Sequence, residues 1–341
     1  MSVSKHLAIG LPFVVQEKQA YAPPMETFPP PTPPLRKTPF TTFFGVIQHE
    51  LDVTERLLRS NAIGFLFIFM GGLLARFIRA PPSSLRDAAK GTVLALAADL
   101  LCSYTFDICN QATSPEEDSL NKPYRPIPAG LLTVEQAKAR WLISWALGPL
   151  VLYHLFGTWA MVSLLSHEAL IAFCYVWPRW NNWFMRNLFV ALIYYIQGRL
   201  LNQMLASVGP GWDMDMLIDL SISAWFMGTI HVQEFHDVEG DRKSGRKTLA
   251  VLLSPRGLRV LRTGTALSIT AFGAGLAFLG FQKMDQHVFI GPVSVLQLVS
   301  SAVLAYRVWA SNSPEMDRVT YQVYYYIPVL FILIALALVF K

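Results

Sequence analysis

Residues 322–340 read QVYYYIPVLFILIALALVF, a run of nineteen residues without a charged side chain. A helix that crosses the hydrocarbon core of a bilayer needs about 20 mostly apolar residues. Similar runs recur from Asn61 onward, and only 15% of the whole chain is charged, against about 25% in soluble proteins. The sequence therefore predicts an all-α integral membrane protein.

The apolar runs predict a bundle of nine transmembrane helices, with two further segments before it. Residues 1–39 are rich in proline, which predicts a disordered tail. Residues 40–59 mix apolar and charged positions, as an amphipathic helix lying on the membrane surface does. Residues 60–341 form the transmembrane domain. Its predicted spans are 60–79, 87–109, 139–157, 159–177, 184–206, 214–234, 259–280, 287–309 and 322–340.

The positive charge of the chain indicates a membrane orientation rather than a nucleic-acid partner. The formal net charge is +5, and the cations fall in short loops between apolar runs. Most of them lie in the loops after spans two, four, six and eight, which predicts that these loops and the N-terminus face the cytosol. Nothing in the sequence indicates a protein partner. Cys102, Cys109 and Cys174 lie in or beside apolar runs, which predicts small buried side chains.

Two long polar segments follow spans two and six, so they face the same side of the membrane. The first polar segment, residues 110–138, begins NQATSPEEDSLNKPYRP, and the second, residues 234–262, begins EFHDVEGDRKSGRK. Acids three or four residues apart share one face of a helix. Mg²⁺ prefers carboxylate and amide oxygens and completes its shell with phosphate, while Lys and Arg neutralise the remaining phosphate charge. The pattern predicts a site for a diphosphate with a hydrocarbon tail.

The motifs in these segments resemble those of the UbiA prenyltransferase superfamily. Asn110-Gln111-x-x-Ser114-x-x-x-Asp118-x-x-Asn121 is similar to its first Asp-rich motif, and Glu234-x-x-Asp237-x-x-Gly240-Asp241 is similar to its second. Between them, residues 175–179 are similar to the family's Tyr-x-x-x-Lys element, with Arg in place of Lys. The resemblance covers the chain from about residue 61 to its end, so residues 60–341 are expected to form a UbiA-type catalytic domain.

The resemblance implies a role for each of these side chains. The family ionises allylic diphosphates with Mg²⁺, so an isoprenoid diphosphate is the expected substrate. The expected metal ligands are Asn110, Asp118, Glu234, Asp237 and Asp241. Of these, Asp118, Asp237 and Asp241 are also expected to be catalytic. The expected diphosphate contacts are Lys122, Arg125, Tyr175, Arg179 and Lys247.

One departure from the family pattern bears on the reaction. Ser114 stands where the first motif has an Asp, so a metal ligand is missing unless Asp107 or Glu117 replaces it. The sequence of this motif resembles that of the fungal UbiA-type membrane sesquiterpene cyclases. The resemblance implies that farnesyl diphosphate is the substrate and is cyclised. It also implies an endoplasmic reticulum membrane, with the site expected to face the cytosol. The alternative is transfer of the prenyl group to an aromatic, polyketide or quinone-precursor acceptor. A transporter is the remote alternative.

Several side chains inside the predicted bundle are candidates for further roles. Arg199, Asn202 and Gln203 either serve function or mark the end of span five at the opposite membrane face. His231 and His236 flank the second motif, and His236 is a candidate proton acceptor. Aromatic faces attract cations. The aromatic candidates are Phe106, Tyr175, Trp177, Tyr194, Tyr195, Trp225 and Phe226.

Overall fold

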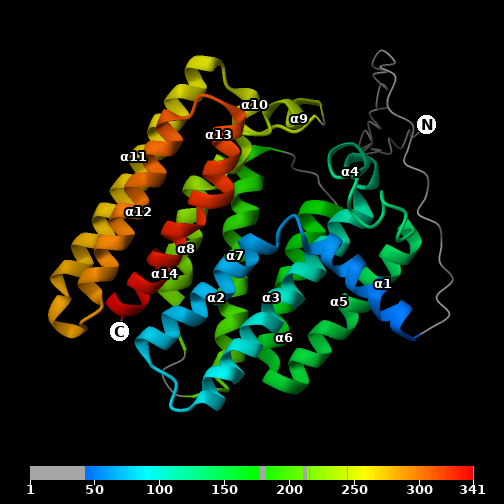
Figure 1. Cartoon of the computed structure of the whole chain (residues 1–341), viewed down its shortest axis with the longest axis horizontal. Helices are drawn as coiled ribbons and strands as arrows, with labels where there is room; N and C mark the ends of the chain where they lie inside the picture. The colour runs from blue at the N-terminus through cyan, green and yellow to red at the C-terminus, as the bar shows by residue number, and fades with distance from the viewer. Residues whose placement is uncertain (1–42, 177–181, 210–212, 215, 244, 341) are drawn as a thin grey trace, which may run out of the picture. The chain divides into compact units, whose positions relative to one another are not determined.

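The computed structural model describes residues 43–176, 182–209, 213–214, 216–243 and 245–340. All regular elements of this part of the chain are helical (Figure 1). The predicted tail 1–39 and the first three residues of the predicted surface helix lie outside it. Arg179 and Trp177, two of the predicted site residues, also lie outside the described residues.

The helices have the following bounds, with short 3₁₀ or π turns labelled η. In the first half they are α1 Phe43–Leu58, α2 Ala62–Arg79, α3 Leu85–Thr113, α4 Pro115–Asn121, α5 Val134–Phe156, α6 Thr158–Ile171, η1 Ala172–Val176 and α7 Trp183–Leu205. In the second half they are α8 Met216–Thr229, η2 Ile230–Glu234, α9 Val238–Lys243, α10 Leu249–Leu252, α11 Pro255–Gln282, η3 Met284–Gln286, α12 Ile290–Ala310, α13 Pro314–Val319, η4 Thr320–Tyr324 and α14 Tyr326–Val339.

The helical class is confirmed, whereas the count of nine membrane spans is not. Every predicted span coincides with a helix. Within the described residues, however, only five helical stretches are long and apolar enough to cross a membrane when judged by length and composition. They are Leu85–Thr113, Thr158–Val176, Pro255–Gln282, Ile290–Ala310 and Pro314–Val339. The helix α8 has only 14 residues, and α5 carries Glu135, Lys138 and Arg140 in its first two turns. Short or charged helices need neighbours to bury their polar groups.

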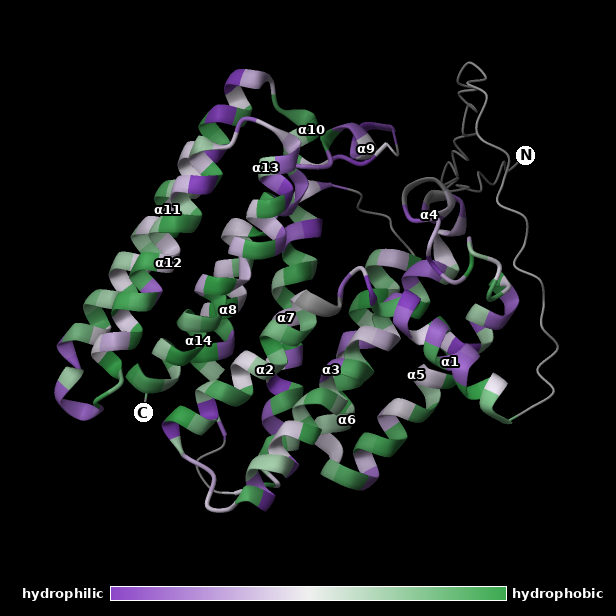
Figure 2. Cartoon of the chain, viewed as in Figure 1, coloured by the Kyte–Doolittle hydropathy of each residue, from purple (hydrophilic) through white to green (hydrophobic). Residues whose placement is uncertain are grey.

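The long helices pack side by side into a closed ring. The contacts run from α2 through α3, α5, α6, α7, α8, α11, α12 and α14, and α14 returns to α2. The core lies inside this ring, and α14 is the helix that it buries most completely. Apolar residues make up most of the helices, and hydrophilic residues are frequent in α9 and along α1 (Figure 2). Large side chains such as Leu142, Leu147 and Val260 are exposed on the outside, as lipid contact requires.

Local sequence signals account for where several of these helices begin and end. Thr133 caps α5 through a capping box in which the Thr133 side chain and the Gln136 side chain satisfy each other's backbone N–H groups. Ser254 and Ser313 cap α11 and α13, and each is followed by a proline in the first turn. Gly157, with φ of 86°, joins α5 to α6 in a conformation that favours glycine.

The helix α1 is amphipathic, as its sequence predicts. Val53 and Leu57 are buried, and α1 packs against α3. Phe43, Phe44 and Leu51 leave more than 60% of their surface exposed. An exposed apolar face next to a membrane bundle is typical of an interfacial helix. The position of α1 on the membrane surface stays a prediction.

Candidate functional site

The two polar segments lie at the same end of the helix ring. The first contains α4, which follows α3, and the second contains α9, which follows α8 and η2 (Figure 1). Burial lowers the pKa of Lys122, and the positive charges of Arg125 and of Arg246 lower it further. Arg246 belongs to the second segment, so the two segments lie within electrostatic range of each other. Their orientation toward the cytosol stays a prediction.

An ion pair between Asp118 and Arg125 organises the first segment. Both side chains are buried, and Nη1 of Arg125 donates to the two carboxylate oxygens of Asp118, each at 2.7 Å. Arg125 also donates to Oγ of Ser60 at 3.1 Å, which ties the segment to the turn between α1 and α2. Asn110 lies in the last turn of α3 rather than in a loop, because α3 continues to Thr113. Asn110 and Lys122 are half-buried.

Asp107 is a second acid at this end of α3, one helical turn before Asn110. Its side chain is fully buried, and Nδ2 of Asn61 donates to its Oδ1 at 2.6 Å. Its Oδ2 has no hydrogen-bond partner among the described atoms. A buried carboxylate oxygen without a partner is costly, so its presence needs a cause such as a bound ion. The side chain of Glu117, the other candidate to replace the acid missing at Ser114, lies outside the description.

In the second segment, three acids differ in exposure and in partners. Glu234 is buried in η2, where Nε of Arg186 donates to its Oε1 at 3.1 Å and its Oε2 lacks a partner. Asp237 is exposed, whereas Asp241 is buried and pairs with Arg246 at 3.2 Å. Lys247 is exposed. The second segment therefore contains an exposed carboxylate at Asp237, a buried carboxylate oxygen without a partner at Glu234, and an acid in an ion pair at Asp241.

Gly240 explains the glycine of the second motif. A Cβ atom built at this position would collide with Oδ1 of Asp237. The missing side chain leaves room for the Asp237 carboxylate to lie against the backbone of α9. Glycine is used where another group approaches the backbone this closely.

These donors fit Mg²⁺, although they are not gathered into a preformed cage. Among the described residues, no three His, Cys, Asp or Glu side chains lie close enough together to hold a metal ion by themselves. Mg²⁺ is commonly held by one or two carboxylates together with waters and substrate phosphates, so a three-acid cluster is not required. The unpartnered oxygens of Asp107 and Glu234 are hard donors of the right kind.

An aromatic layer lies inside the bundle beside this end. It consists of Phe65, Phe106, Tyr175 and Phe189, from α2, α3, η1 and α7. The ring centroids of Phe106 and Tyr175 are 5.3 Å apart, and those of Tyr175 and Phe189 are 5.2 Å apart. Tyr175 lies on the π turn η1, which widens the helix at this point. Such turns occur frequently at functional sites.

A second group of rings packs further round the ring of helices. Tyr194 stacks on Phe226 with centroids 3.9 Å apart, and Phe226 contacts Tyr325. Trp225 packs instead on Phe272 of α11. Thus Phe106 and Tyr175 belong to one aromatic group and Tyr194 and Phe226 to another, a division that the sequence does not reveal.

The polar residues late in α7 are held by structural contacts. Arg199 forms an ion pair with Asp219 at 3.0 Å, and the side chain of Asn202 accepts from Arg76 at 2.9 Å and from the backbone N–H of Met214 at 2.6 Å. These contacts join α7 to α2 and α8 at the end of α7 far from the polar segments. They favour the structural interpretation of Arg199 and Asn202.

The two histidines beside the second motif, His231 and His236, have different surroundings. Nε2 of His231 shares a hydrogen bond with the Thr265 hydroxyl at 2.7 Å. His236 is half-buried and stacks on Tyr321 with ring centroids 6.0 Å apart, and its Nδ1 lacks a partner. Burial lowers the pKa of His236. His236 thus remains a candidate proton acceptor at this end of the bundle.

Two cations and one amide of the site do not appear among the residues predicted from the motifs. Arg186 donates a hydrogen bond to Glu234, Arg246 donates to Asp241, and Asn61 donates to Asp107. Arg246 could have been found, since it follows Asp241 by five residues in a run of cations. The other two pairs join residues 48 and 46 positions apart, and no local pattern indicates them.

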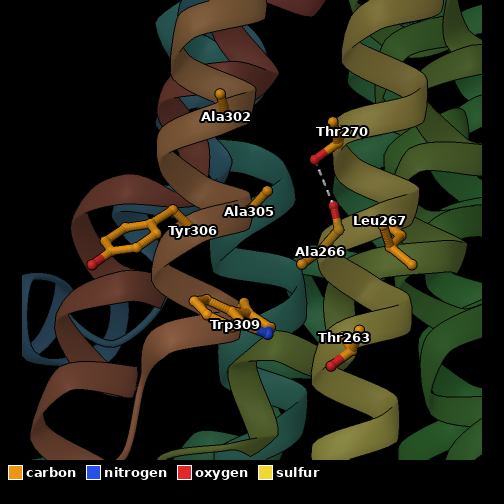
Figure 3. A pocket seen from close by; sticks show the side chains of 8 residues that line it. All are labelled: Thr263, Ala266, Leu267, Thr270, Ala302, Ala305, Tyr306 and Trp309. Carbon is orange, nitrogen blue, oxygen red and sulfur yellow. Dashed lines mark hydrogen bonds between the residues drawn. The ribbon is translucent and has the colours of Figure 1, made fainter.

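A separate pocket of about 280 Å³ lies between α11 and α12 (Figure 3). No charged side chain lines it, and it contains none of the predicted site residues. The lining side chains are Thr263, Ala266, Leu267, Thr270, Ala302, Ala305, Tyr306 and Trp309. The pocket therefore lacks the groups that a diphosphate needs.

Comparisons with known proteins agree with this fold. The model of the UbiA prenyltransferase family matches residues 65–339. Diterpene cyclase eriG of Hericium erinaceus is 31% identical over 233 residues, which covers 66% of this chain and 69% of that protein. Polyprenyl transferase eriF of the same fungus is 28% identical over 226 residues, covering 66% of this chain and 73% of that protein. The solved structure of a UbiA homolog from Archaeoglobus fulgidus bound to DMAPP and Mg²⁺ superposes with a TM-score of 0.58 at 17% identity, covering 84% of this chain and 99% of that one, which shows the shared fold.

Proposed function

Because this chain belongs to the UbiA prenyltransferase family, we propose that it ionises an allylic isoprenoid diphosphate with Mg²⁺ and cyclises the resulting cation within the same molecule. The proposed substrate is farnesyl diphosphate or a close homologue, and the enzyme is then a membrane-bound terpene cyclase. The similarity to diterpene cyclase eriG supports cyclisation, and the Mg²⁺ and DMAPP named for the Archaeoglobus fulgidus homolog support the metal and the substrate class.

The acids of both segments are the proposed metal ligands. Asn110, Asp118, Glu234, Asp237 and Asp241 would hold Mg²⁺, and Asp107 would supply the carboxylate that Ser114 lacks. Support for Asp107 comes from its buried, unpartnered Oδ2 one turn from Asn110. When bound, Mg²⁺ would neutralise the diphosphate and make it a better leaving group. Lys122, Arg125, Tyr175, Arg179 and Lys247 would contact the phosphate oxygens.

The ion pair between Asp118 and Arg125 links the binding of the anion to that of the cation. One guanidinium nitrogen of Arg125, Nη1, donates to both carboxylate oxygens of Asp118. A diphosphate attracts the same guanidinium, because phosphate is recognised by the same donors as carboxylate. Movement of Arg125 toward phosphate would free Asp118 to bind a metal. Diphosphate and Mg²⁺ are therefore expected to bind cooperatively.

The observation that carries the proposal of cyclisation is the aromatic layer of Phe65, Phe106, Tyr175 and Phe189. Phe106 lies on α3 one turn before Asn110, so the rings begin where the polar donors end. A ring face attracts a cation by about 0.5–2 kcal/mol, and more so away from water. The layer would stabilise positive charge on the hydrocarbon after the diphosphate leaves, and its apolar packing would exclude water from the cation.

Transfer of the prenyl group to an external acceptor is the second candidate. The similarity to polyprenyl transferase eriF favours it, since that relative is nearly as close as the cyclase. The two candidates share the fold, the donor substrate and the proposed metal site. They differ in whether a second molecule is needed for the allyl group to react.

The test uses membranes containing the full-length protein, farnesyl diphosphate and Mg²⁺ without an acceptor. Under the proposal, a cyclic hydrocarbon accumulates in the headspace, as measured by gas chromatography with mass detection, and chelation of Mg²⁺ abolishes it. The variant Asp237→Asn loses diphosphate release, whereas Asp285→Asn, an exposed acid in η3, retains it. If diphosphate is released only after an aromatic acceptor is added, the protein is a transferase.

A further inference from the structure

Four polar side chains lie deeper in the bundle than the aromatic layer and have no part in the site described above. Asp99 comes from α3, His167 and Glu168 from α6, and Gln197 from α7. His167 and Gln197 are fully buried, and their Nε2 atoms lie 3.3 Å apart. Glu168 is 4% exposed, and Asp99 is half-buried and accepts from Oγ of Ser103 at 3.3 Å. We call these four residues the inner polar group.

The inner polar group faces the interior of the bundle rather than lipid. On α6, Leu164, His167, Glu168 and Ile171 are buried, whereas residues 165, 166 and 169 are exposed. This spacing is one face of a helix, and α6 packs on α5, α7 and α3. On this face, His167 contacts Gln197 of α7. Ionisable side chains at such depth are rare in membrane proteins and usually belong to functional sites.

Several polar atoms of the group have no partner. Nδ1 of His167, Oε1 of Glu168 and Oε1 of Gln197 are all buried without a hydrogen bond among the described atoms. Two of these atoms, Nδ1 of His167 and Oε1 of Gln197, belong to side chains in contact, and each calls for an explanation because buried polar groups are nearly always satisfied. Such atoms are available to accept a proton or to bind a polar atom of a ligand.

Three helices place the inner polar group at the same depth below the aromatic layer. His167 precedes Tyr175 by eight residues, Asp99 precedes Phe106 by seven, and Gln197 follows Phe189 by eight. At about 1.5 Å per residue, each separation is about 11–12 Å along the helix axis. Seen from the polar segments, the order is diphosphate donors, aromatic layer, inner polar group. Under the proposed function, a hydrocarbon whose diphosphate is held by the segments would extend past the aromatic layer toward the inner polar group.

The imidazole of His167 is suited to accept a proton at this position. The oxygen and nitrogen of an amide side chain such as that of Gln197 can exchange places with little change in shape. With its oxygen toward His167, Gln197 accepts the hydrogen on Nε2, and the Nδ1 lone pair is then free.

We propose that His167 is the base that ends the cyclisation, with Gln197 as its positioning residue, and this inference rests on the proposed cyclase function. The final carbocation loses a hydrogen from the carbon next to the positive centre. The electrons of that C–H bond form the new C=C bond, and the proton passes to Nδ1 of His167. The imidazolium returns the proton to water when the product leaves, and the diphosphate departs as the anion formed in the first step.

The test compares His167→Phe and Gln197→Leu with His154→Gln, a control at an exposed histidine of the neighbouring α5. Membranes with farnesyl diphosphate and Mg²⁺ are assayed for released diphosphate and, by gas chromatography with mass detection, for products. We expect diphosphate release to stay within about threefold of the unmodified protein. We expect the main hydrocarbon to fall at least about tenfold as a share of product in both variants, replaced by alcohols or by isomers with the double bond elsewhere.

Folding and ionisation are separated by a third measurement, the thermal stabilisation of each variant by inorganic diphosphate with Mg²⁺. If a variant is stabilised normally yet diphosphate release and hydrocarbon fall in parallel, His167 supports ionisation and the proposal is overturned. An unchanged product profile in His167→Phe overturns it as well. If the unmodified protein makes no hydrocarbon without an acceptor, the proposed cyclase function itself fails, which is a different result from an unaffected variant.

Discussion

Asp107 is the residue whose chemistry bears most directly on the unusual first motif. We expect Asp107→Asn to raise the Mg²⁺ concentration needed for half-maximal diphosphate release at least about tenfold, because a metal ligand or its close support is lost. The substitution keeps the oxygen that accepts from Asn61, so the fold is preserved. The measurement is a Mg²⁺ titration of diphosphate release.

Two further variants test whether the effect of Asp107→Asn comes from the loss of a metal ligand. Adding Ser114→Asp to Asp107→Asn should restore the Mg²⁺ requirement, since the carboxylate returns to its place in the family motif. Glu116→Gln is the control, because Glu116 is an exposed acid of the same segment. An unchanged titration for Asp107→Asn would exclude this residue as the replacement ligand.

Gly240 is the second residue with a sharp prediction. We expect Gly240→Ala to displace the Asp237 carboxylate, because the added Cβ would collide with its Oδ1. Mg²⁺-dependent diphosphate release should fall by about the same factor as in Asp237→Asn. Gly228→Ala is the matched control, since a Cβ at that exposed position of α8 meets no atom within 4 Å. Equal activity of the two glycine variants would contradict this role.

At the scale of elements, the short helix α13 is joined to α11 by a buried ion pair. Arg262 donates to both oxygens of Asp317, at 2.7 and 2.6 Å, and its guanidinium lies 4.2 Å from the ring centroid of Phe235. Removal of one partner leaves an unpaired buried charge. We expect Asp317→Leu to cost about 3–5 kcal/mol of unfolding free energy, measured by thermal unfolding in detergent.

The matched comparisons separate charge from packing. The double variant Arg262→Met with Asp317→Leu should lose less stability than Asp317→Leu alone, because no isolated charge remains. Glu55→Gln, which breaks an exposed ion pair with Arg59 on α1, should cost at most about 1 kcal/mol. A double variant less stable than the single one would show that the pair itself, rather than the stranded charge, stabilises the contact of α11 and α13.

The two π turns, η1 and η4, each place a tyrosine next to the site. η1 carries Tyr175 into the aromatic layer, and η4 carries Tyr321 against His236 of the second segment. A π turn adds one residue to a helical turn and so rotates the side chains that follow it. Both turns lie near the ends of helices that approach the polar segments.

At the scale of the whole molecule, ligand binding should join parts of the chain far apart in sequence. Diphosphate and Mg²⁺ together would contact segments that begin at residues 110 and 234. We expect their joint addition at about 100 times the dissociation constant to stabilise the protein by about 2.7 kcal/mol, seen as a rise in Tm. Either component alone should give a much smaller rise, because Arg125 and Asp118 neutralise each other. An equal rise with Mg²⁺ alone would contradict the cooperative mechanism.

Much of this architecture was readable from local sequence. The apolar runs mark every long helix, and the caps at Thr133, Ser254 and Ser313 mark helix starts, because both signals act between residues a few positions apart. The polar segments were found for the same reason. The boundaries were less accurate where a helix continues into a polar sequence, as α3 does to Thr113. The number of spans stays a prediction, because hydropathy reports apolarity and not which helices bury their charges against neighbours.

By itself, then, the sequence determined the helical membrane class, the family and the two motifs, since each depends on composition or on spacing along one helix or loop. The tertiary structure decided which polar groups meet. The contact of Asn61 with Asp107, the pair of Arg262 and Asp317, and the contact of His167 with Gln197 join residues 46, 55 and 30 positions apart. Such partners are selected by the packing of helices around a common core, where an unpaired polar group is costly, and no local pattern encodes that choice.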